Sequence, residues 1–82
     1  MTSKKRVVLI TGAESGIGKS TSKIFLDNGY KVICTYLKNN NNKNTNYIEY
    51  HRIDITKNKD WENLALYIKK KYKKIDVLVN SA

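Results

Sequence analysis

The stretch that most constrains the fold runs from Val7 to Ser22, where an apolar run leads into three closely spaced glycines. Four consecutive apolar residues, Val7 to Ile10, predict a strand that is buried on both faces, as strands of parallel sheets are. Gly12, Gly16 and Gly18 follow, and a helix-compatible segment begins among them. A strand, a glycine turn and a helix start leave unpaired backbone N–H groups at the positive end of the helix dipole. The sequence therefore predicts an anion site, and its natural occupant is a phosphate group.

The segment that follows the turn, residues 17–28, is compatible with an amphipathic helix. Its expected apolar face comprises Ile17, Thr21, Ile24 and Phe25. Gly29 follows at the position where a left-handed residue commonly ends a helix. We expect Ile17 to close the floor of the turn, and Thr11 and Ser15 to add hydroxyl donors to the phosphate site.

Two kinds of phosphate site compete for this turn. The dinucleotide fingerprint G-x-G-x-x-G does not fit, because the second residue after Gly12 is Glu14. The P-loop pattern G-x-x-x-x-G-K-[ST] fits at residues 18–20, but it places Ala13 where its first glycine belongs, and only a looser form would match. In a P-loop, Lys19 would reach the β- and γ-phosphates of a nucleotide, whereas in a dinucleotide turn it would point to solvent. From these residues alone, both a P-loop and a dinucleotide-binding turn remain possible.

The remainder of the chain predicts a small α/β fold. Further strands are expected at residues 30–36, 47–53 and 75–80, and a second helix at residues 58–72. The polar run at residues 38–46 is too short for a crossover helix and indicates a solvent loop. This order fits a Rossmann-like, doubly wound parallel sheet with strand order 3-2-1-4, whose third strand lies at an edge. In that sheet the Gly12 turn lies beside residues 80–82.

Three spaced motifs resemble the short-chain dehydrogenase/reductase (SDR) family, and together they span nearly the whole chain. The turn Thr11-Gly12-x-x-x-Gly16-x-Gly18 resembles the cofactor turn of that family, in which the pyrophosphate of NAD or NADP lies over the glycines. Asp54-Ile55-Thr56 matches the family's Asp-hydrophobic-Thr motif. The segment from Asp76 to Ala82 resembles D-x-L-V-N-N-A-G, with Ser81 in place of the second Asn.

The resemblance implies a dinucleotide site at the carboxyl ends of the strands. The implied contact residues are Gly12, Ser15, Gly16, Ile17, Gly18, Tyr36, Lys38, Asp54, Ile55, Asn80, Ser81 and Ala82. In the family, the acidic residue that Asp54 matches lies against the adenine amino group. The first Asn of the last motif, here Asn80, steadies the central sheet, and the residues after it pass close to the adenine ribose. No metal site is expected.

The choice between NAD and NADP is expected at the end of the second strand. A carboxylate there would bind the ribose 2′-hydroxyl of NAD and repel the 2′-phosphate of NADP. Residues 35–38 are Thr, Tyr, Leu and Lys, without a carboxylate. With Lys38 nearby, the sequence favours NADP over NAD.

The resemblance does not extend to catalytic residues. The family's catalytic serine, and its tyrosine and lysine in a Y-x-x-x-K arrangement, lie downstream of the last motif, and the chain ends before them. Tyr67 and Lys71 have the same spacing, but they fall in the lysine-rich second helix, and no catalytic role is assigned to them. We therefore expect residues 1–82 to be the N-terminal, cofactor-binding part of a single domain, truncated or a fragment, and inactive alone.

The complete protein implied by the resemblance would transfer hydride between NAD(P) and a carbonyl or alcohol substrate and would form a homo-oligomer. Two other functions remain open from the residues alone. One is a P-loop nucleotide-binding protein, and the other is a non-catalytic module that retains the dinucleotide turn.

Composition limits the partners that such a chain can have. Sixteen Lys and Arg residues against seven Asp and Glu residues give a formal net charge of +9. The lysines lie mainly on helix faces and ends rather than among aromatic residues, so we expect a basic surface and no nucleic-acid partner. The single cysteine, Cys34, lies in an apolar run and is expected to be a buried thiol. The apolar run after the basic N-terminus is too short for a signal peptide or a membrane span, so a cytoplasmic location is expected.

Overall fold

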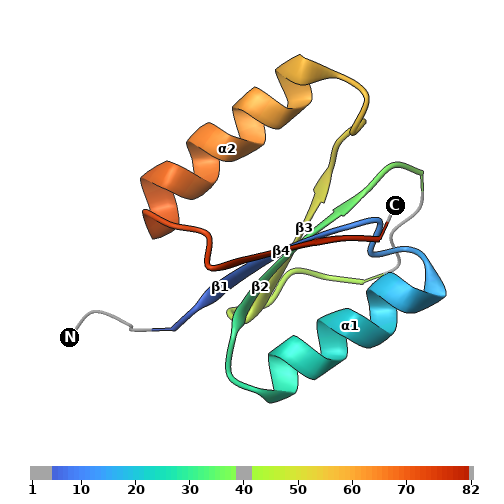
Figure 1. Cartoon of the computed structure of the whole chain (residues 1–82), viewed down its shortest axis with the longest axis vertical. Coiled ribbons are helices and arrows are strands. Elements are labelled where there is room, and N and C mark those ends of the chain that lie inside the picture. Colours follow the sequence, from blue (N-terminus) through green and yellow to red (C-terminus); the bar gives the residue numbers. More distant parts are fainter. Residues whose placement is uncertain (1–4, 39–41, 82) are drawn as a thin grey trace.

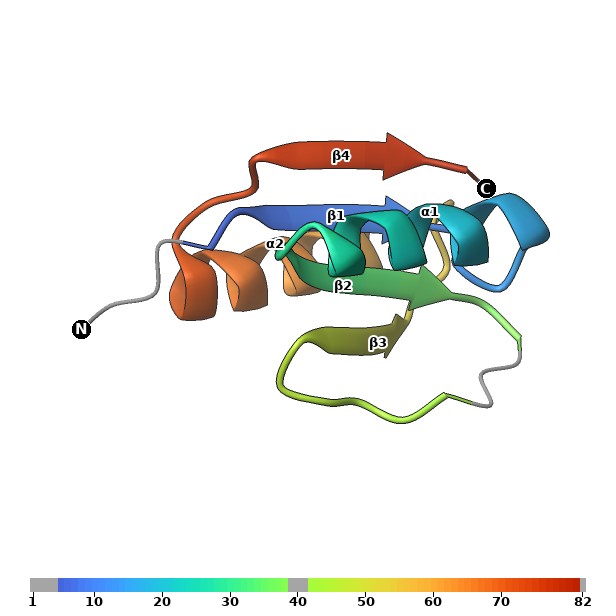
Figure 2. The same ribbon diagram turned by 90° about the horizontal axis from the view of Figure 1, so that it is seen from below.

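The computed structural model describes residues 5–38 and 42–81, which form four strands and two helices (Figure 1). In chain order these are β1 (Val7–Thr11), α1 (Gly16–Asp27), β2 (Lys31–Tyr36), β3 (Ile48–Arg52), α2 (Asn58–Tyr72) and β4 (Val77–Asn80). The strands make one parallel sheet in the order β3-β2-β1-β4, and all of them point the same way (Figure 2). The predicted Rossmann-like α/β fold, with strand order 3-2-1-4, is therefore confirmed as a partial version of that fold.

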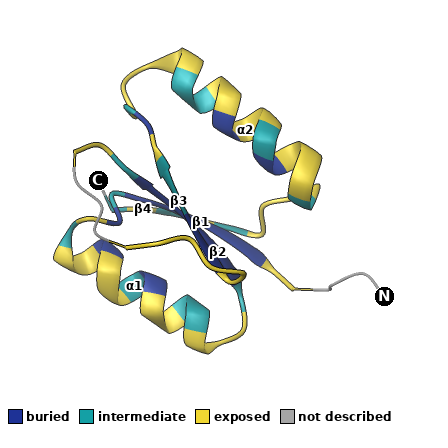
Figure 3. Ribbon diagram, turned by 180° about the vertical axis from the view of Figure 1, so that it is seen from behind, coloured by how far each residue is buried: buried dark blue, intermediate teal, exposed yellow. Residues whose placement is uncertain are grey.

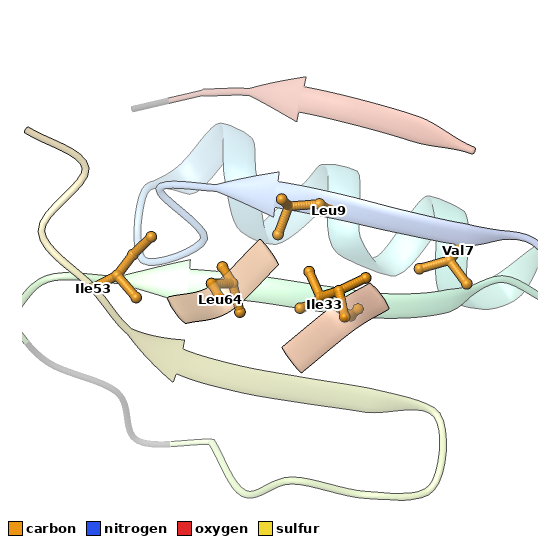
Figure 4. Close-up of a cluster of buried hydrophobic side chains, with 6 residues drawn as sticks. Val7, Leu9, Ile33, Ile53 and Leu64 are labelled. Atoms are coloured by element: carbon orange, nitrogen blue, oxygen red, sulfur yellow. The ribbon is translucent and has the colours of Figure 1, made fainter. Parts of the chain in front are cut away.

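The two helices cover opposite faces of the sheet, so the alternating side chains of β1 and β2 enter two separate clusters (Figures 1 and 3). On the α1 face, Val8, Ile10, Val32 and Cys34 are completely or almost completely buried. On the α2 face, Leu9 and Ile33 pack with Leu64 of the helix (Figure 4). Burial on both faces is what the continuous apolar run in β1 predicts. The thiol of Cys34 is buried, as expected, and burial raises its pKa.

Helix α1 begins and ends within one residue of the predicted bounds, but it presents a different face to the sheet. Gly29 follows the helix with a φ of 82°, the left-handed conformation expected of it. The buried residues of the helix are Gly18 and Ser22, whereas Ile17 and Ile24 are 73% and 60% exposed. The predicted apolar face is therefore wrong for Ile17 and Ile24. The reason is close packing, because a small residue on the inner face lets the first turn of the helix lie directly against the end of β1.

Helix α2 is attached to β3 through the buried carboxylate of Glu49. Tyr67 Oη donates to Glu49 Oε1 at 2.7 Å, and Tyr72 Oη donates to Glu49 Oε2. Lys71 Nζ lies 2.9 Å and Lys31 Nζ 3.4 Å from Glu49 Oε2. Burial by itself raises the pKa of this carboxyl, but the hydrogen bonds from Tyr72, Tyr67, His51 and Lys71 together hold it far below its usual range. Glu49 is therefore ionised in the folded protein at neutral pH.

The edges of the sheet are β3 and β4. The predicted edge position of the third strand is confirmed, since β3 pairs with β2 and, among the described residues, with no other strand. Residues 42–47 before it are exposed and form neither helix nor strand, as expected of a solvent loop. Leu78 of β4 is 61% exposed.

Neither helix of the described chain is long and apolar enough to cross a membrane.

Candidate functional site

The glycine turn between β1 and α1 lies at the carboxyl end of the sheet (Figure 2). Gly12 has a φ of 68°, a left-handed conformation that favours glycine. A Cβ atom at Gly18 would lie 2.3 Å from the carbonyl oxygen of Gly12, so a side chain there would force the helix away from the turn. At Gly16 a Cβ atom would meet nothing within 4 Å, which shows that open space adjoins this residue.

Ser15 fixes the start of α1. Its hydroxyl accepts a hydrogen bond from Gly18 N–H at 2.9 Å and donates one to the Gly12 carbonyl at 2.9 Å. The hydroxyl is thus used within the turn, as the N-cap of the helix, rather than pointing freely toward a ligand. The first N–H groups of a helix have no partner inside it. Within the described residues those of Gly16 and Ile17 make no hydrogen bond, so the turn offers two main-chain donors beside an open space.

Ile17 does not close the floor of the turn. Its side chain is 73% exposed, whereas Gly18 and Ala13 are buried and fill the space beneath the turn. The prediction for the side chain of Ile17 is therefore wrong, and what Ile17 presents at the turn is a backbone N–H and an exposed side chain.

The end of β4 lies beside the end of β1, as the strand order requires. Thr11 and Asn80 are paired residues in the sheet, and Thr11 Oγ1 donates to Asn80 Oδ1 at 2.8 Å. Ser81 N–H donates to the Thr11 carbonyl at 3.3 Å, and the Ser81 hydroxyl donates to the same oxygen. The structure therefore places Asn80 and Ser81 next to the glycine turn, while Ala82 lies outside the described residues. The Thr11 hydroxyl is used in this contact and not as a ligand donor.

The end of β2 approaches the glycine turn from the other side. Ala13 N–H donates to the Thr35 carbonyl at 3.0 Å, which ties the turn to this strand. Tyr36 is half-buried and Lys38 is exposed. Sequence reasoning missed a residue here: Glu14 Oε2 accepts hydrogen bonds from Leu37 N–H at 3.1 Å and Lys38 N–H at 3.3 Å. The sequence feature that could have indicated Glu14 is the expected pairing of the first two strands, which brings the glycine turn next to the end of β2.

Asp54 and Ile55 follow β3, the strand furthest from β4. Asp54 Oδ1 accepts from the Thr56 hydroxyl at 2.6 Å and from Thr56 N–H at 3.0 Å, and these bonds lower the pKa of Asp54. Ile55 is partly exposed, and its carbonyl accepts from Trp61 Nε1 at 2.7 Å. Both residues therefore lie in an ordered turn that leads into α2, and the contacts of Asp54 are those of a local turn.

A P-loop site would also need an Asp at the carboxyl end of a strand to hold Mg²⁺, and Asp76 does not lie there. Asp76 precedes β4, at the amino end of the sheet, where it accepts from Val7 N–H at 2.7 Å and pairs with Lys74 at 3.1 Å. The hydrogen bond from Val7 is the main reason that the pKa of Asp76 is lowered. Asp76 lies at the amino ends of β1 and β4, whereas the glycine turn follows the carboxyl end of β1 (Figure 2), so the two are at opposite ends of the same strands. In the described part of the chain, no group of three or more His, Cys, Asp or Glu residues could hold a metal ion.

Tyr67 and Lys71 lie on α2 and are occupied by Glu49. Tyr67 Oη donates to that carboxylate and accepts from Lys71 Nζ at 3.1 Å. Burial and the bond to Glu49 raise the pKa of Tyr67, which makes its hydroxyl a weaker acid. These contacts favour a structural role for the pair.

Comparison with known proteins points to one family. The family model described as short chain dehydrogenase matches residues 6–82. The chain is 38% identical over 82 residues to an NAD-dependent glycerol dehydrogenase of Listeria innocua, which covers 94% of this chain and 32% of that protein. It is 32% identical over 83 residues to short-chain dehydrogenase reductase 5 of Arabidopsis thaliana, with the same coverage. The chain thus spans about a third of the length of the curated relatives it matches.

Solved structures give the same result. A short chain dehydrogenase from Leptospira borgpetersenii with bound NAD+ superposes with a TM-score of 0.83 at 28% identity, covering 93% of this chain and 30% of that one. ElxO with NADP bound superposes with a TM-score of 0.82 at 35% identity, covering 95% of this chain and 35% of that one.

Proposed function

Because the chain belongs to the short-chain dehydrogenase family, we propose that it is the cofactor-binding part of an NAD(P)-dependent oxidoreductase. The whole protein would transfer hydride between the nicotinamide of its dinucleotide and a carbonyl or alcohol substrate. This chain contributes the binding of the adenosine and pyrophosphate parts, and the chemical step is assigned to the whole protein. A homo-oligomeric state and a cytoplasmic location stay predictions.

The observation that carries the proposal is the glycine turn. Two backbone N–H groups, those of Gly16 and Ile17, have no partner among the described residues and adjoin the open space at Gly16. They lie at the positive end of the α1 dipole, which favours a negatively charged ligand. A pyrophosphate fits this combination of donors, charge and room.

The adenosine half of the dinucleotide is assigned to the ends of the neighbouring strands. Tyr36 and Lys38 lie at the end of β2, and Asn80 and Ser81 lie at the end of β4. Asp54 and Ile55, in the turn after β3, are proposed to lie on the adenine side. In a doubly wound sheet, ligands bind outside the carboxyl ends of the strands, where the strand order reverses, and these residues lie at or just after the carboxyl ends of β2, β3 and β4.

The choice between NAD and NADP is a finer question. The sequence favours NADP because residues 35–38 contain no carboxylate and include Lys38. Similar solved structures hold NAD+ in one case and NADP in another, so likeness does not decide between them. The charges that other segments bring to the end of β2 must therefore be counted as well.

The test is dinucleotide binding by the purified chain, measured by calorimetry with NADH and NADPH. Gly16→Val places a side chain in the open space of the turn, where its Cβ atom would meet nothing within 4 Å, so we expect loss of binding with the fold intact by circular dichroism. Lys19→Ala is the matched control on the same helix. Retained binding in Lys19→Ala supports the dinucleotide turn, whereas magnesium-dependent ATP binding that is lost in this variant would support a P-loop and contradict the proposal.

A further inference from the structure

We propose that Glu14 discriminates against the 2′-phosphate of NADP and gives this site a preference for NAD. The inference rests on the proposed function, because it concerns the adenosine end of the same dinucleotide. It revises the preference drawn from the strand end alone, since the structure brings a carboxylate to that strand end from a different segment.

The position of Glu14 follows from the pairing of β1 with β2. The two strands run in parallel from Val7 opposite Lys31 to Ile10 opposite Cys34, so they end side by side. The turn that follows β1 is tied to β2 by the hydrogen bond from Ala13 N–H to the Thr35 carbonyl. Glu14 is the next residue, and its side chain reaches the backbone just beyond β2.

The carboxylate of Glu14 occupies two main-chain donors at this place. A single oxygen, Oε2, accepts from Leu37 N–H at 3.1 Å and from Lys38 N–H at 3.3 Å. In a Rossmann-like sheet the ribose 2′-hydroxyl is bound at this strand end by a carboxylate. A carboxylate can accept a hydrogen bond from the 2′-hydroxyl of NAD, because it has several lone pairs and no donor of its own when ionised.

The same arrangement is unfavourable for NADP. The two N–H groups that could donate to phosphate oxygens are already bonded to Glu14, and the carboxylate repels a second anion. Lys38 and Arg52 oppose this repulsion. Both are exposed, and Arg52 Nε donates to the Leu37 carbonyl at 3.1 Å. Glu14 is exposed as well, so water screens all three charges alike, and Lys38 and Arg52 reduce the effect of Glu14 without restoring the two donors.

The experiment compares the dissociation constants of NADH and NADPH in the wild-type chain, Glu14→Gln and Glu14→Ala. Gln keeps an oxygen that can accept from both N–H groups but removes the charge, whereas Ala removes the charge and frees both donors. Glu62→Gln is the control, since it removes one exposed carboxylate from α2. We expect the wild type to bind NADH about tenfold more tightly than NADPH. In Glu14→Gln the dissociation constants of NADPH and NADH should have a ratio near one. In Glu14→Ala this ratio of the NADPH to the NADH constant should be lower still, because both N–H donors are free.

Two results would overturn the inference while leaving the proposed function standing. One is a wild type that binds NADPH more tightly than NADH, and the other is a ratio that neither Glu14 variant changes. Binding of neither dinucleotide by the folded wild-type chain would instead contradict the proposed function, and the inference with it. Thermal unfolding of each variant verifies that the fold is retained.

Discussion

Thr11 and Asn80 are 69 residues apart in the chain, yet they face each other in the sheet and are joined by a 2.8 Å hydrogen bond between their side chains. The bond joins the strand that leads into the glycine turn to the strand that ends the described chain. It lies where the strand order reverses, because β2 flanks β1 on one side and β4 on the other. The geometry of the proposed site therefore depends on a contact that is distant in sequence.

Replacing Thr11 with Val tests this contact. Threonine and valine have side chains of similar shape, and Thr11 is buried, so the main loss is the hydrogen bond to Asn80. We therefore expect the free energy of unfolding to fall by about 1 kcal/mol. Urea unfolding of Thr11→Val, Asn80→Ala and the double variant measures the coupling between the two residues. Strictly additive effects would show that the bond contributes nothing to stability.

Gly18 and Gly16 form a matched pair on the same helix turn. Gly18→Ala places a Cβ atom against the Gly12 carbonyl, and we expect a loss of about 3 kcal/mol in the free energy of unfolding. Gly16→Ala meets no neighbour and is expected to stay within about 0.5 kcal/mol of the wild type. Equal effects of the two substitutions, measured by chemical denaturation, would contradict the described packing of α1 on the turn.

Glu49→Gln tests the attachment of α2. Lys31 would keep its buried charge while losing its ionised partner, so we expect a loss of about 3 kcal/mol at pH 7. The pKa of Glu49 is lowered by folding, so its contribution is complete above the unfolded pKa of about 4.3 and decreases as the pH falls below that value. The difference between wild type and Glu49→Gln should therefore narrow as the pH falls below about 4.3. A difference that stays constant down to pH 3 would contradict the lowered pKa, and Glu62→Gln serves as the exposed control.

Much of the fold could be predicted because it depends on local chemistry. The apolar run of β1 and the glycine after α1 each indicate where an element lies or ends, and the order of elements leaves few topologies. The face that α1 packs against the sheet could not be predicted in this way, because apolar periodicity indicates Ile17 and Ile24. Close contact between the helix and Gly12 instead selects the glycine at position 18. Apolar periodicity reports only hydrophobicity, whereas the inner face of α1 is determined by how closely the backbone of the helix approaches that of Gly12.

The parts of the site that escaped prediction depend on contacts between distant segments. Glu14 appeared in the sequence only as the residue that spoils the G-x-G-x-x-G pattern, and its partners Leu37 and Lys38 become neighbours only when β1 and β2 pair. Glu49 was placed on a strand, but its partners Tyr67 and Tyr72 come from the helix that packs on that strand. Polar side chains carry no periodic signal that would reveal such partners.

The central claim is that main-chain donors of the glycine turn hold a pyrophosphate. The most direct measurement is an NMR titration of the isotope-labelled chain with NAD+, which follows each backbone N–H group. The account predicts the largest shifts at Gly16 and Ile17, smaller shifts at Leu37 and Lys38, and none on the outer face of α2. Unchanged signals from Gly16 and Ile17 at saturating NAD+, or maximal shifts elsewhere, would contradict it.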